Sequence, residues 1–315
     1  MNLLRIFIPM MLLMACQTNK SWLAEDQRPL PWMGQIYSSE KGDWISSEAM
    51  LADLRTADIV LLGERHDHPD HWRLQLEITQ ALQNQNRLAL VFEHFARDQQ
   101  KILESLRKEK VGVENWAERL QWGKSGWPAW ERFTPLMTYA VEHEIDIVAA
   151  NLSRADVKNL FQGDLKAVFR EEELNRYRFT SQTLSQENLQ SLRAQIEESH
   201  CHPMQEPMLS SMVRVQRGRD LALAEGIVQA VQEHKRVILF AGSGHVRKDW
   251  GVPELLARLE KNWQVRSVAM VQAPDDWPAF QAQGLPYDYV WLTPAVDLRD
   301  PCEVYRQQLQ KFKQK

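Results

Sequence analysis

Short apolar runs alternate with longer stretches of helical periodicity along most of this chain. Five runs are largely apolar, and each follows a segment that reads as an amphipathic helix. Strands that are buried on both faces give such continuous runs, and helices connect the strands of parallel sheets. We therefore predict an α/β fold with a mostly parallel central sheet flanked by helices. The predicted strands are residues 58–62, 88–92, 146–150, 237–241 and 265–270.

The remaining segments give three further predictions. Residues 205–234 are expected to form one long helix, because apolar side chains recur there at roughly helical spacing. Residues 152–204 are polar and helical with no strand candidate, which indicates a helical insertion or lid. Residues 273–294 are rich in proline, glycine and aromatic side chains, so we expect an irregular tail with one short strand at 287–292.

The first fifteen residues form a hydrophobic segment that is too short to span a bilayer. Arg5 is their single charge, and the apolar run 6–14 follows it, whereas a membrane-spanning helix needs about 20 residues. The run ends in Ala15-Cys16, and a small residue before a cysteine resembles a lipoprotein cleavage site. We therefore expect residues 1–15 to be a signal peptide and Cys16 to carry the lipid.

The residues after the cysteine suggest where the mature protein resides. Gln17-Thr18 follow in place of an aspartate, which resembles lipoproteins sorted to the outer membrane. Several acyl chains, palmitate among them, anchor a protein stably, because a single chain binds only weakly. We expect an outer-membrane, lipid-anchored protein that faces the periplasm; an ordinary secretory signal is the alternative. The predicted organisation is a tether at 16–33, a main domain at 34–272 and a C-terminal extension packed on it at 273–315.

Composition and charge exclude one class of partner. The chain is 44% hydrophobic and 25% charged, which is typical of a globular protein, and its formal net charge is -4. Without a basic footprint, nucleic acid is not an expected partner. Cys201 and Cys302 remain besides Cys16. Their separation in sequence does not fix their distance in space, and the sequence favours two free thiols over a disulfide.

Polar residues follow four of the predicted strands at the point where each strand ends. Ligands bind at the carboxyl ends of the strands in open parallel sheets, so we expect these residues to form one site. A glycine after two of the strands is expected to let the chain turn sharply and approach a ligand. The four segments are Gly63-Glu64-Arg65-His66, Glu93-His94, Asn151 and Gly242-Ser243-Gly244-His245.

Histidine and carboxylate side chains in these segments suit a metal ion. His66, His68 and His71 lie within six residues of one another beside Glu64. Histidine with carboxylate is a ligand set of zinc, iron and manganese sites. His245 has the matching position after another strand. Because His66 and His245 are expected in turns outside the packed core, replacing either should cost at most about 1 to 2 kcal/mol.

Glu93 ends an otherwise apolar strand. A carboxylate in that position must be paired, metal-bound or functional to offset its loss of hydration. An ion pair with Arg219 on the long helix is the structural alternative to a functional role. The other histidines lack such a pattern and are expected to be structural: His143, His200, His202 and His234.

At these residues the chain resembles the ChaN family of haem-binding uptake lipoproteins, a branch of the Tiki and erythromycin-esterase superfamily. The resemblance extends from about residue 34 to residue 272. It includes the superfamily pattern of two G-x-x-H motifs with a glutamate between them, at Gly63 to His66, Glu93, and Gly242 to His245. The matching segments are residues 60–69, 91–95, 126–128, 149–152, 219–220, 242–246 and 251–253.

The resemblance implies a ligand, partners and site residues. Tiki members use this set as metal-dependent proteases and esterase relatives use it to activate water, whereas the ChaN branch is described as binding cofacial haems between two protomers. It thus implies haem, a homodimer and an outer-membrane haem receptor or transporter as partners. The implied site is Glu64, His66, Glu93 and His245, supported by Gly63, His68, His94, Asn151, Arg219, Gly242 and Gly244.

No motif fixes the axial ligand of the haem iron. Phenolate suits ferric haem, and imidazole suits either oxidation state. Haem also needs a broad apolar cleft, and the aromatic residues expected to help line it are Trp122, Trp127, Trp130 and Phe133. The open axial candidates are Tyr37, Tyr139, Tyr177, His68 and His94.

Two functions therefore remain open. The first, which the sequence favours, is haem binding by a membrane-anchored protein in iron acquisition. The second is a metal-dependent peptidase or esterase, in which a zinc or manganese ion or an activated water serves hydrolysis. The residues of that hydrolase site would be Glu64, His66, Glu93 and His245. A site without function is less favoured, because all four strand-end motifs are intact.

Overall fold

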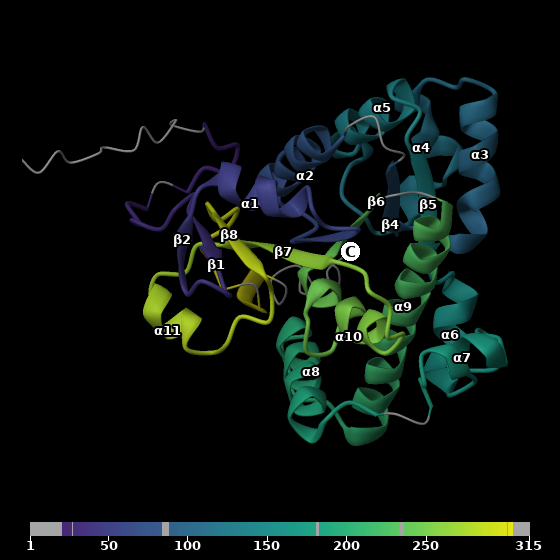
Figure 1. Cartoon of the computed structure of the whole chain (residues 1–315). Coiled ribbons are helices and arrows are strands. Elements are labelled where there is room, and N and C mark those ends of the chain that lie inside the picture. Colours follow the sequence, from purple (N-terminus) through teal and green to yellow (C-terminus); the bar gives the residue numbers. More distant parts are fainter. Residues whose placement is uncertain are drawn as a thin grey trace, which may run out of the picture.

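An eight-stranded sheet with helices on both faces forms the centre of this protein (Figure 1). The computed structural model describes residues 21–26, 28–83, 88–180, 183–233, 236–300 and 302–304. The strand order is β2-β1-β8-β7-β3-β6-β4-β5, and all pairs from β8 to β5 are parallel. The strands are β1 Ile36–Ser38, β2 Asp43–Ile45, β3 Ile59–Glu64, β4 Leu88–Ala96, β5 Asp146–Asn151, β6 Arg236–Gly242, β7 Val265–Gln272 and β8 Tyr289–Thr293.

The predicted α/β architecture is confirmed. The five strands read from the apolar runs are β3 to β7, and the short strand expected at 287–292 is β8. Sequence reasoning missed the antiparallel strands β1 and β2, because three residues each are too few to show a period. β8 lies between β7 and β1, so the segment after residue 272 supplies a strand to the same sheet.

Side chains alternate between the two faces of the sheet and build two apolar cores. In β3, Val60 and Leu62 pack in one core and Ile59 and Leu61 in the other, as the two-residue period of a strand requires. The helices over the first core are α1 Ser47–Leu54, α2 Pro69–Leu82, α3 Gln100–Lys108, α4 Trp116–Arg119 and α5 Thr134–Glu142. The second core involves α6 Arg154–Gln162, α7 Glu171–Arg176, α9 Glu206–Glu233 and α10 Val252–Ala257.

The remaining helices complete the predicted insertion and the tail. The insertion expected at 152–204 contains α6, α7 and α8 Gln186–Ser199, and the long helix expected at 205–234 is α9. In the tail, α11 spans Trp277–Gln281. Short 3-10 helices are η1 Arg97–Gln99, η2 Val113–Asn115, η3 Trp122–Lys124, η4 Trp130–Arg132 and η5 Ser243–Val246.

Helix α9 passes close to the sheet. A Cβ atom on its Gly226 would lie 2.7 Å from the Cβ of Ala150 in β5, nearer than two such atoms can approach. The helix therefore needs a glycine at this contact. This close packing brings the preceding turns of α9 alongside the carboxyl ends of β5 and β4 (Figure 1).

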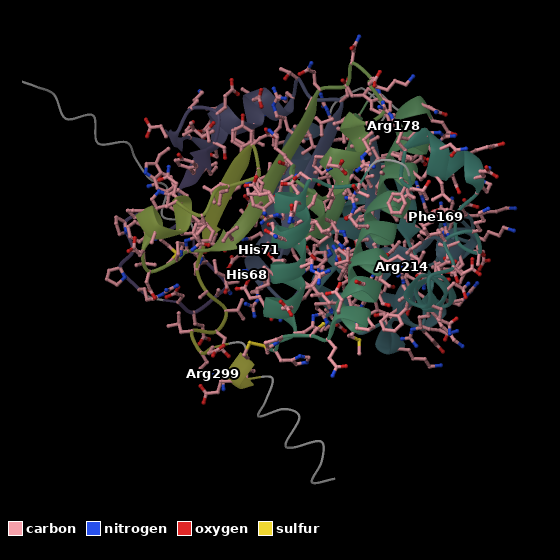
Figure 2. The ribbon with its side chains drawn as sticks, turned by 90° about the horizontal axis from the view of Figure 1, so that it is seen from below. His68, His71, Phe169, Arg178, Arg214 and Arg299 are labelled. Carbon is pink, nitrogen blue, oxygen red and sulfur yellow. A yellow bond between two sulfur atoms is a disulfide. The ribbon has the colours of Figure 1, made fainter. Side chains whose placement is uncertain are left out.

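Cys201 and Cys302 form a disulfide, so the expectation of two free thiols is wrong. Their Cα atoms are 5.3 Å apart although 101 positions separate them in sequence. The fold places the loop after α8 beside the C-terminal helical turn at residues 302–304, where the yellow bond in Figure 2 lies. The pairing depends on the path of the tail across the sheet, which no local pattern reveals.

A single side chain covers part of the free edge of β5. Gln100, at the start of α3, donates from Nε2 to the carbonyl of Ile147 at 3.2 Å. Its Oε1 accepts from the backbone N–H of Ala149 at 2.7 Å. The carboxamide thereby takes the place of a peptide group from a further strand.

The expected signal peptide at 1–15 and lipid-bearing Cys16 lie outside the described residues. Within the described ranges, no helix is long and apolar enough to cross a membrane. The first described segment is fixed to the domain, because the backbone N–H groups of Leu23 and Ala24 donate to the carboxylate of Asp70.

Candidate functional site

Glu64, the last residue of β3, is a buried carboxylate that three side chains bind. His66 Nδ1 and His94 Nε2 each lie 2.9 Å from its Oε1, and Gln75 donates to its Oε2 at 2.8 Å. Burial opposes ionisation of Glu64, but the two histidines outweigh it and lower its pKa. The ligand atoms of Glu64, His66 and His94 lie within 4.8 Å of one another. One carboxylate and two imidazoles are a donor set that suits a divalent transition metal.

Glu93 and His245 belong to a second buried ion cluster. His245 Nε2 lies 3.3 Å from Glu93 Oε1, and His245 Nδ1 lies 2.6 Å from Asp220 Oδ1. The N–H of Gly242 donates to the other Glu93 oxygen at 2.7 Å. Burial alone would lower the pKa of His245, but the carboxylates of Glu93 and Asp220 raise it to about 10. His245 is thus an imidazolium held between two carboxylates, with both ring nitrogens occupied.

This cluster corrects two expectations. Glu93 pairs with His245, and no ion pair between Glu93 and Arg219 exists in the described structure. His245 was expected in a turn outside the core, yet only 4% of it is exposed. Asp220 was not among the predicted site residues, although its neighbour Arg219 was. It lies on α9 with its carboxylate buried, and only the packing of that helix against the sheet reveals its role.

The three histidines that cluster in sequence separate in space. Both His68 and His71 are fully buried, and their stacked rings lie 3.8 Å apart. Figure 2 labels the two residues beside each other. His68 caps α2 by accepting from the N–H of Asp70, and its Nε2 lies 2.7 Å from the Pro294 carbonyl. His71 Nε2 lies 3.0 Å from the Thr293 hydroxyl. Assigning His68 to the site or to a haem iron was therefore wrong, because its two nitrogens hold α2 and the end of β8.

The glycines near the strand ends permit close packing instead of sharp turns. None of Gly63, Gly242 and Gly244 has a positive φ. A Cβ on Gly63 would lie 2.3 Å from a methyl group of Val246, and one on Gly242 would lie 3.1 Å from the His66 ring. A side chain at Gly63 would thus separate β3 from the turn after β6, whereas one at Gly242 would press against the His66 ring.

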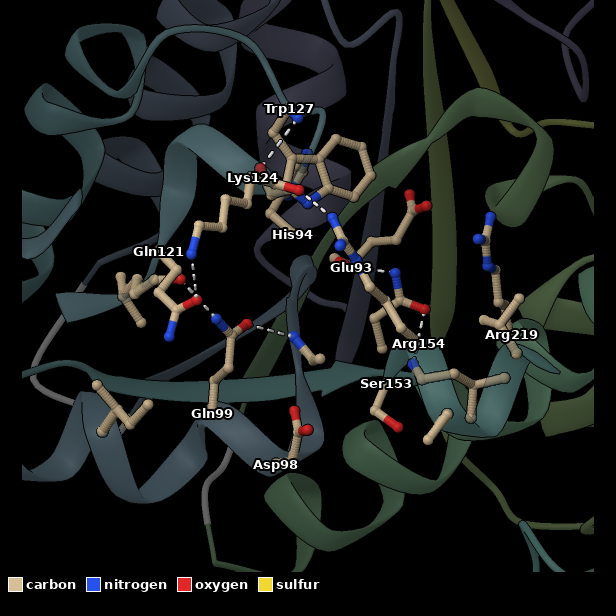
Figure 3. Close-up of a pocket in the computed structure, with 18 of the residues that line it drawn as sticks. Glu93, His94, Asp98, Gln99, Gln121, Lys124, Trp127, Ser153, Arg154 and Arg219 are labelled. Atoms are coloured by element: carbon tan, nitrogen blue, oxygen red, sulfur yellow. Dashed lines mark hydrogen bonds between the residues drawn. The ribbon is translucent and has the colours of Figure 1, made fainter. Parts of the chain in front are cut away.

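A pocket of about 650 Å³ opens beside the two clusters (Figure 3). Glu93 and His94 form part of its wall, and Asn151 fixes the strand end by donating to the Glu93 carbonyl at 2.7 Å. Trp127 also lines this pocket, and its ring lies 4.7 Å from both the His66 and the His94 rings. The other aromatic residues expected to help line a haem cleft are buried core residues: Trp122, Trp130 and Phe133.

The predicted axial ligands lie mostly away from this pocket. Tyr37 is buried in a small core between β1 and α11, Tyr139 lies on α5 beside His143, and Tyr177 is buried after α7. Among the candidates named from the sequence, His94 is the one in the wall of the pocket. Its Nδ1 is buried and has no hydrogen-bond partner in the described structure.

The histidines that were expected to be structural do not line the pocket where they are described. His143 is exposed and its Nδ1 lies 3.0 Å from the carbonyl of Tyr139. His200 follows α8, and His202 is exposed in the loop after it. His234 lies outside the described residues.

Comparison with known proteins gives a family and a fold. A family described as "Haem-binding uptake, Tiki superfamily, ChaN" matches residues 50–256. The structure "Cofacial heme binding to ChaN of Campylobacter jejuni" superposes with a TM-score of 0.64 at 23% identity, over 81% of this chain and 95% of that one. A mutant erythromycin esterase EreC in its open conformation reaches a TM-score of 0.42 at 15% identity, over 83% and 82% of the two chains. No curated protein matches in sequence.

Proposed function

Since the chain belongs to the ChaN family of haem-binding uptake proteins in the Tiki superfamily, we propose that it binds haem in the pocket beside Glu93 and His94. The observation that carries this proposal is the pocket itself. Its volume is within the usual range for small-molecule sites, about 300 to 1,000 Å³. Its wall combines the Trp127 ring, an imidazole and several cationic side chains.

The residues present fit a haem group. When bound, haem supplies an iron centre and a flat apolar ring with two propionates. Trp127 offers an apolar face to such a ring, and cationic side chains on the rim suit propionates. Among the candidate iron ligands, His94 is the one in the pocket wall, but its Nε2 already contacts Glu64.

We further propose that the protein acts in iron acquisition from the outer membrane. The sequence pattern at Cys16 supports lipid anchoring with the domain in the periplasm. Cofacial haem binding to ChaN of Campylobacter jejuni supports a pair of stacked haems, and we propose that a homodimer holds them. An outer-membrane haem receptor or transporter is the further partner that fits this role. Replacing Cys16 with serine should leave a soluble protein or an unprocessed precursor, and a variant of mature length that remains anchored would contradict the lipid attachment.

Titration with haem tests the proposed ligand. With the wild-type protein, the Soret band of haem should shift and the shift should saturate. Trp127→Ala should weaken haem binding by about tenfold, because stacking of a flat ring on an aromatic side chain contributes about 1 to 3 kcal/mol. Trp44→Ala is the matched control, since Trp44 is also half-buried but lies on β2 away from the pocket. A wild-type protein that leaves the haem spectrum unchanged would refute the proposal.

A metal-dependent hydrolase is the second candidate function. The group formed by Glu64, His66 and His94 favours it, since the three are placed to hold zinc or manganese. A bound ion would supply a water of lowered pKa. The sequence placed Glu93 and His245 in the metal set, but these two hold each other and would instead position the strand ends. Metal analysis of purified protein, with His94→Gln as the comparison, tests it: no bound metal and no ester or peptide hydrolysis would exclude this function.

A further inference from the structure

Three cations on the rim of the pocket have no acidic partner in the described parts of the chain. Arg219 comes from α9, Arg154 begins α6, and Lys124 ends η3. Arg154 donates to the carbonyl of Lys124, and Lys124 Nζ lies 3.4 Å from the Gln121 side-chain oxygen. Both partners are neutral, so the positive charges stay uncompensated.

Arg219 differs from the other arginines of the same helix turns. Arg217 pairs with Glu254 at 2.7 Å, and Arg214 donates to the carbonyls of Leu160 and Phe161. Arg219 makes no hydrogen bond or ion pair within the described residues, and its Nε is buried without a partner. Buried donors in native proteins are nearly always satisfied, so a guanidinium that lines the pocket without a protein partner is free to bind an acceptor there.

The acids of the pocket do not neutralise these cations. Glu93 is already held by His245 and by the N–H of Gly242. Asp98 is exposed on η1 and forms no ion pair in the described structure. Figure 3 draws Arg154 and Arg219 on the side of the pocket that also carries Glu93. The pocket therefore presents an excess of positive charge at its rim.

Apolar side chains complete the wall. Ile102, Leu120, Leu152 and Val157 line the pocket together with Trp127. A ligand with a broad apolar body and carboxylates on its edge matches this combination. A neutral apolar ligand would leave the cations unpaired and lose hydration around them.

We propose that Arg219, Arg154 and Lys124 bind the free carboxylates of a tetrapyrrole, so that the pocket selects its ligand by these carboxylates whether or not the ring holds iron. This inference rests on the proposed haem binding and deepens it. Arginine suits the role because its planar guanidinium binds a carboxylate through two parallel hydrogen bonds. It also follows that binding weakens as salt is raised, since the paired charges lie near solvent.

The test compares iron-free protoporphyrin IX with its dimethyl ester, which keeps the ring and removes both charges. Quenching of tryptophan fluorescence measures binding of each to the full-length protein. The free acid should bind about tenfold to a hundredfold more tightly than the ester, as expected for lost charge-assisted hydrogen bonds. Arg219→Gln should weaken binding of the free acid by about tenfold or more, and should leave ester binding within about twofold.

Lys158→Gln is the charge-matched control, because Lys158 is exposed on α6 and does not line the pocket. It should leave both affinities unchanged. If Arg219→Gln fails to fold, Arg154→Gln replaces it, since Arg154 is exposed. Equal affinity of wild-type protein for acid and ester, with haem still bound, would overturn the inference alone. Absence of binding by haem and by both porphyrins would overturn the proposed function and the inference with it.

Discussion

Two groups of histidines lie near the carboxyl edge of the sheet, and their partners differ in kind. The carboxylate-paired group is His66, His94 and His245, whose rings contact the carboxylates of Glu64 and Glu93. The neutral pair is His68 and His71, whose rings contact a backbone N–H, a carbonyl and a hydroxyl. His66 and His68 are two positions apart in sequence but belong to different groups.

The difference shows how partners set the charge of a buried imidazole. Burial lowers the pKa of His68 and His71, and nothing beside them offsets it strongly enough. The same burial acts on His66 and His245, but neighbouring carboxylates outweigh it and raise their pKa. The neutral pair, His68 and His71, serves packing. Among the carboxylate-paired histidines, His94 lines the pocket, and His66 and His94 belong to the candidate metal group with Glu64.

The largest expected effect comes from removing His245. His245→Ala leaves the carboxylates of Glu93 and Asp220 buried without their common cation, and breaking a buried ion pair in this way costs about 3 to 5 kcal/mol. This exceeds the loss expected from the sequence, because the side chain proved to be buried. Urea unfolding at pH 7 measures it, with exposed His143→Ala as the control. A loss below about 1 kcal/mol would show that His245 is not the charge that holds the two acids.

The next effect separates the two groups directly. His71→Ala should lower the free energy of unfolding by about 2 to 4 kcal/mol, because it opens a cavity and leaves hydrogen-bonding groups unsatisfied. His66→Ala should cost at most about 1 kcal/mol, since 37% of its side chain is exposed. Ligand titrations should show the reverse, with weakened binding only for His66→Ala. Similar melting curves for the two variants would contradict the division into two groups.

The last effect is the most gradual, because the pH dependence of stability spreads it over several pH units. The raised pKa of His245 contributes stability that is complete below its ordinary value of 6.5 and is lost as pH rises towards about 10. The lowered pKa of His71 acts in the opposite direction, so its contribution is lost as pH falls below 6.5. Each proton linked to unfolding changes the free energy by at most about 1.4 kcal/mol per pH unit. The free energy of unfolding, measured by urea titration from pH 5 to 10, should decrease on both the acid and the alkaline side of its maximum. His71→Asn should reduce the decrease on the acid side alone.

The sequence predicted the parallel strands and the strand ends beside which the candidate site lies, because apolar runs and the residues that follow them are local signals. The division of the histidines was not predictable in this way. His68 and His71 are structural only because β8 and its Thr293 arrive beside them from more than 200 positions away. Asp220 and the disulfide likewise depend on where α9 and the tail lie in space. The sequence also indicated the glycines at the strand ends. They are needed because neighbouring atoms leave no space for a side chain, which only the packed structure shows.

The carboxamide of Gln100 has a consequence for how this protein behaves at high concentration. β5 is the last strand on its side of the sheet, and uncovered strand edges pair with the edges of other molecules. Gln100 occupies the carbonyl of Ile147 and the N–H of Ala149, which a foreign strand would otherwise use. Solubility of the folded chain thus depends partly on one uncharged side chain that contributes nothing to the pocket.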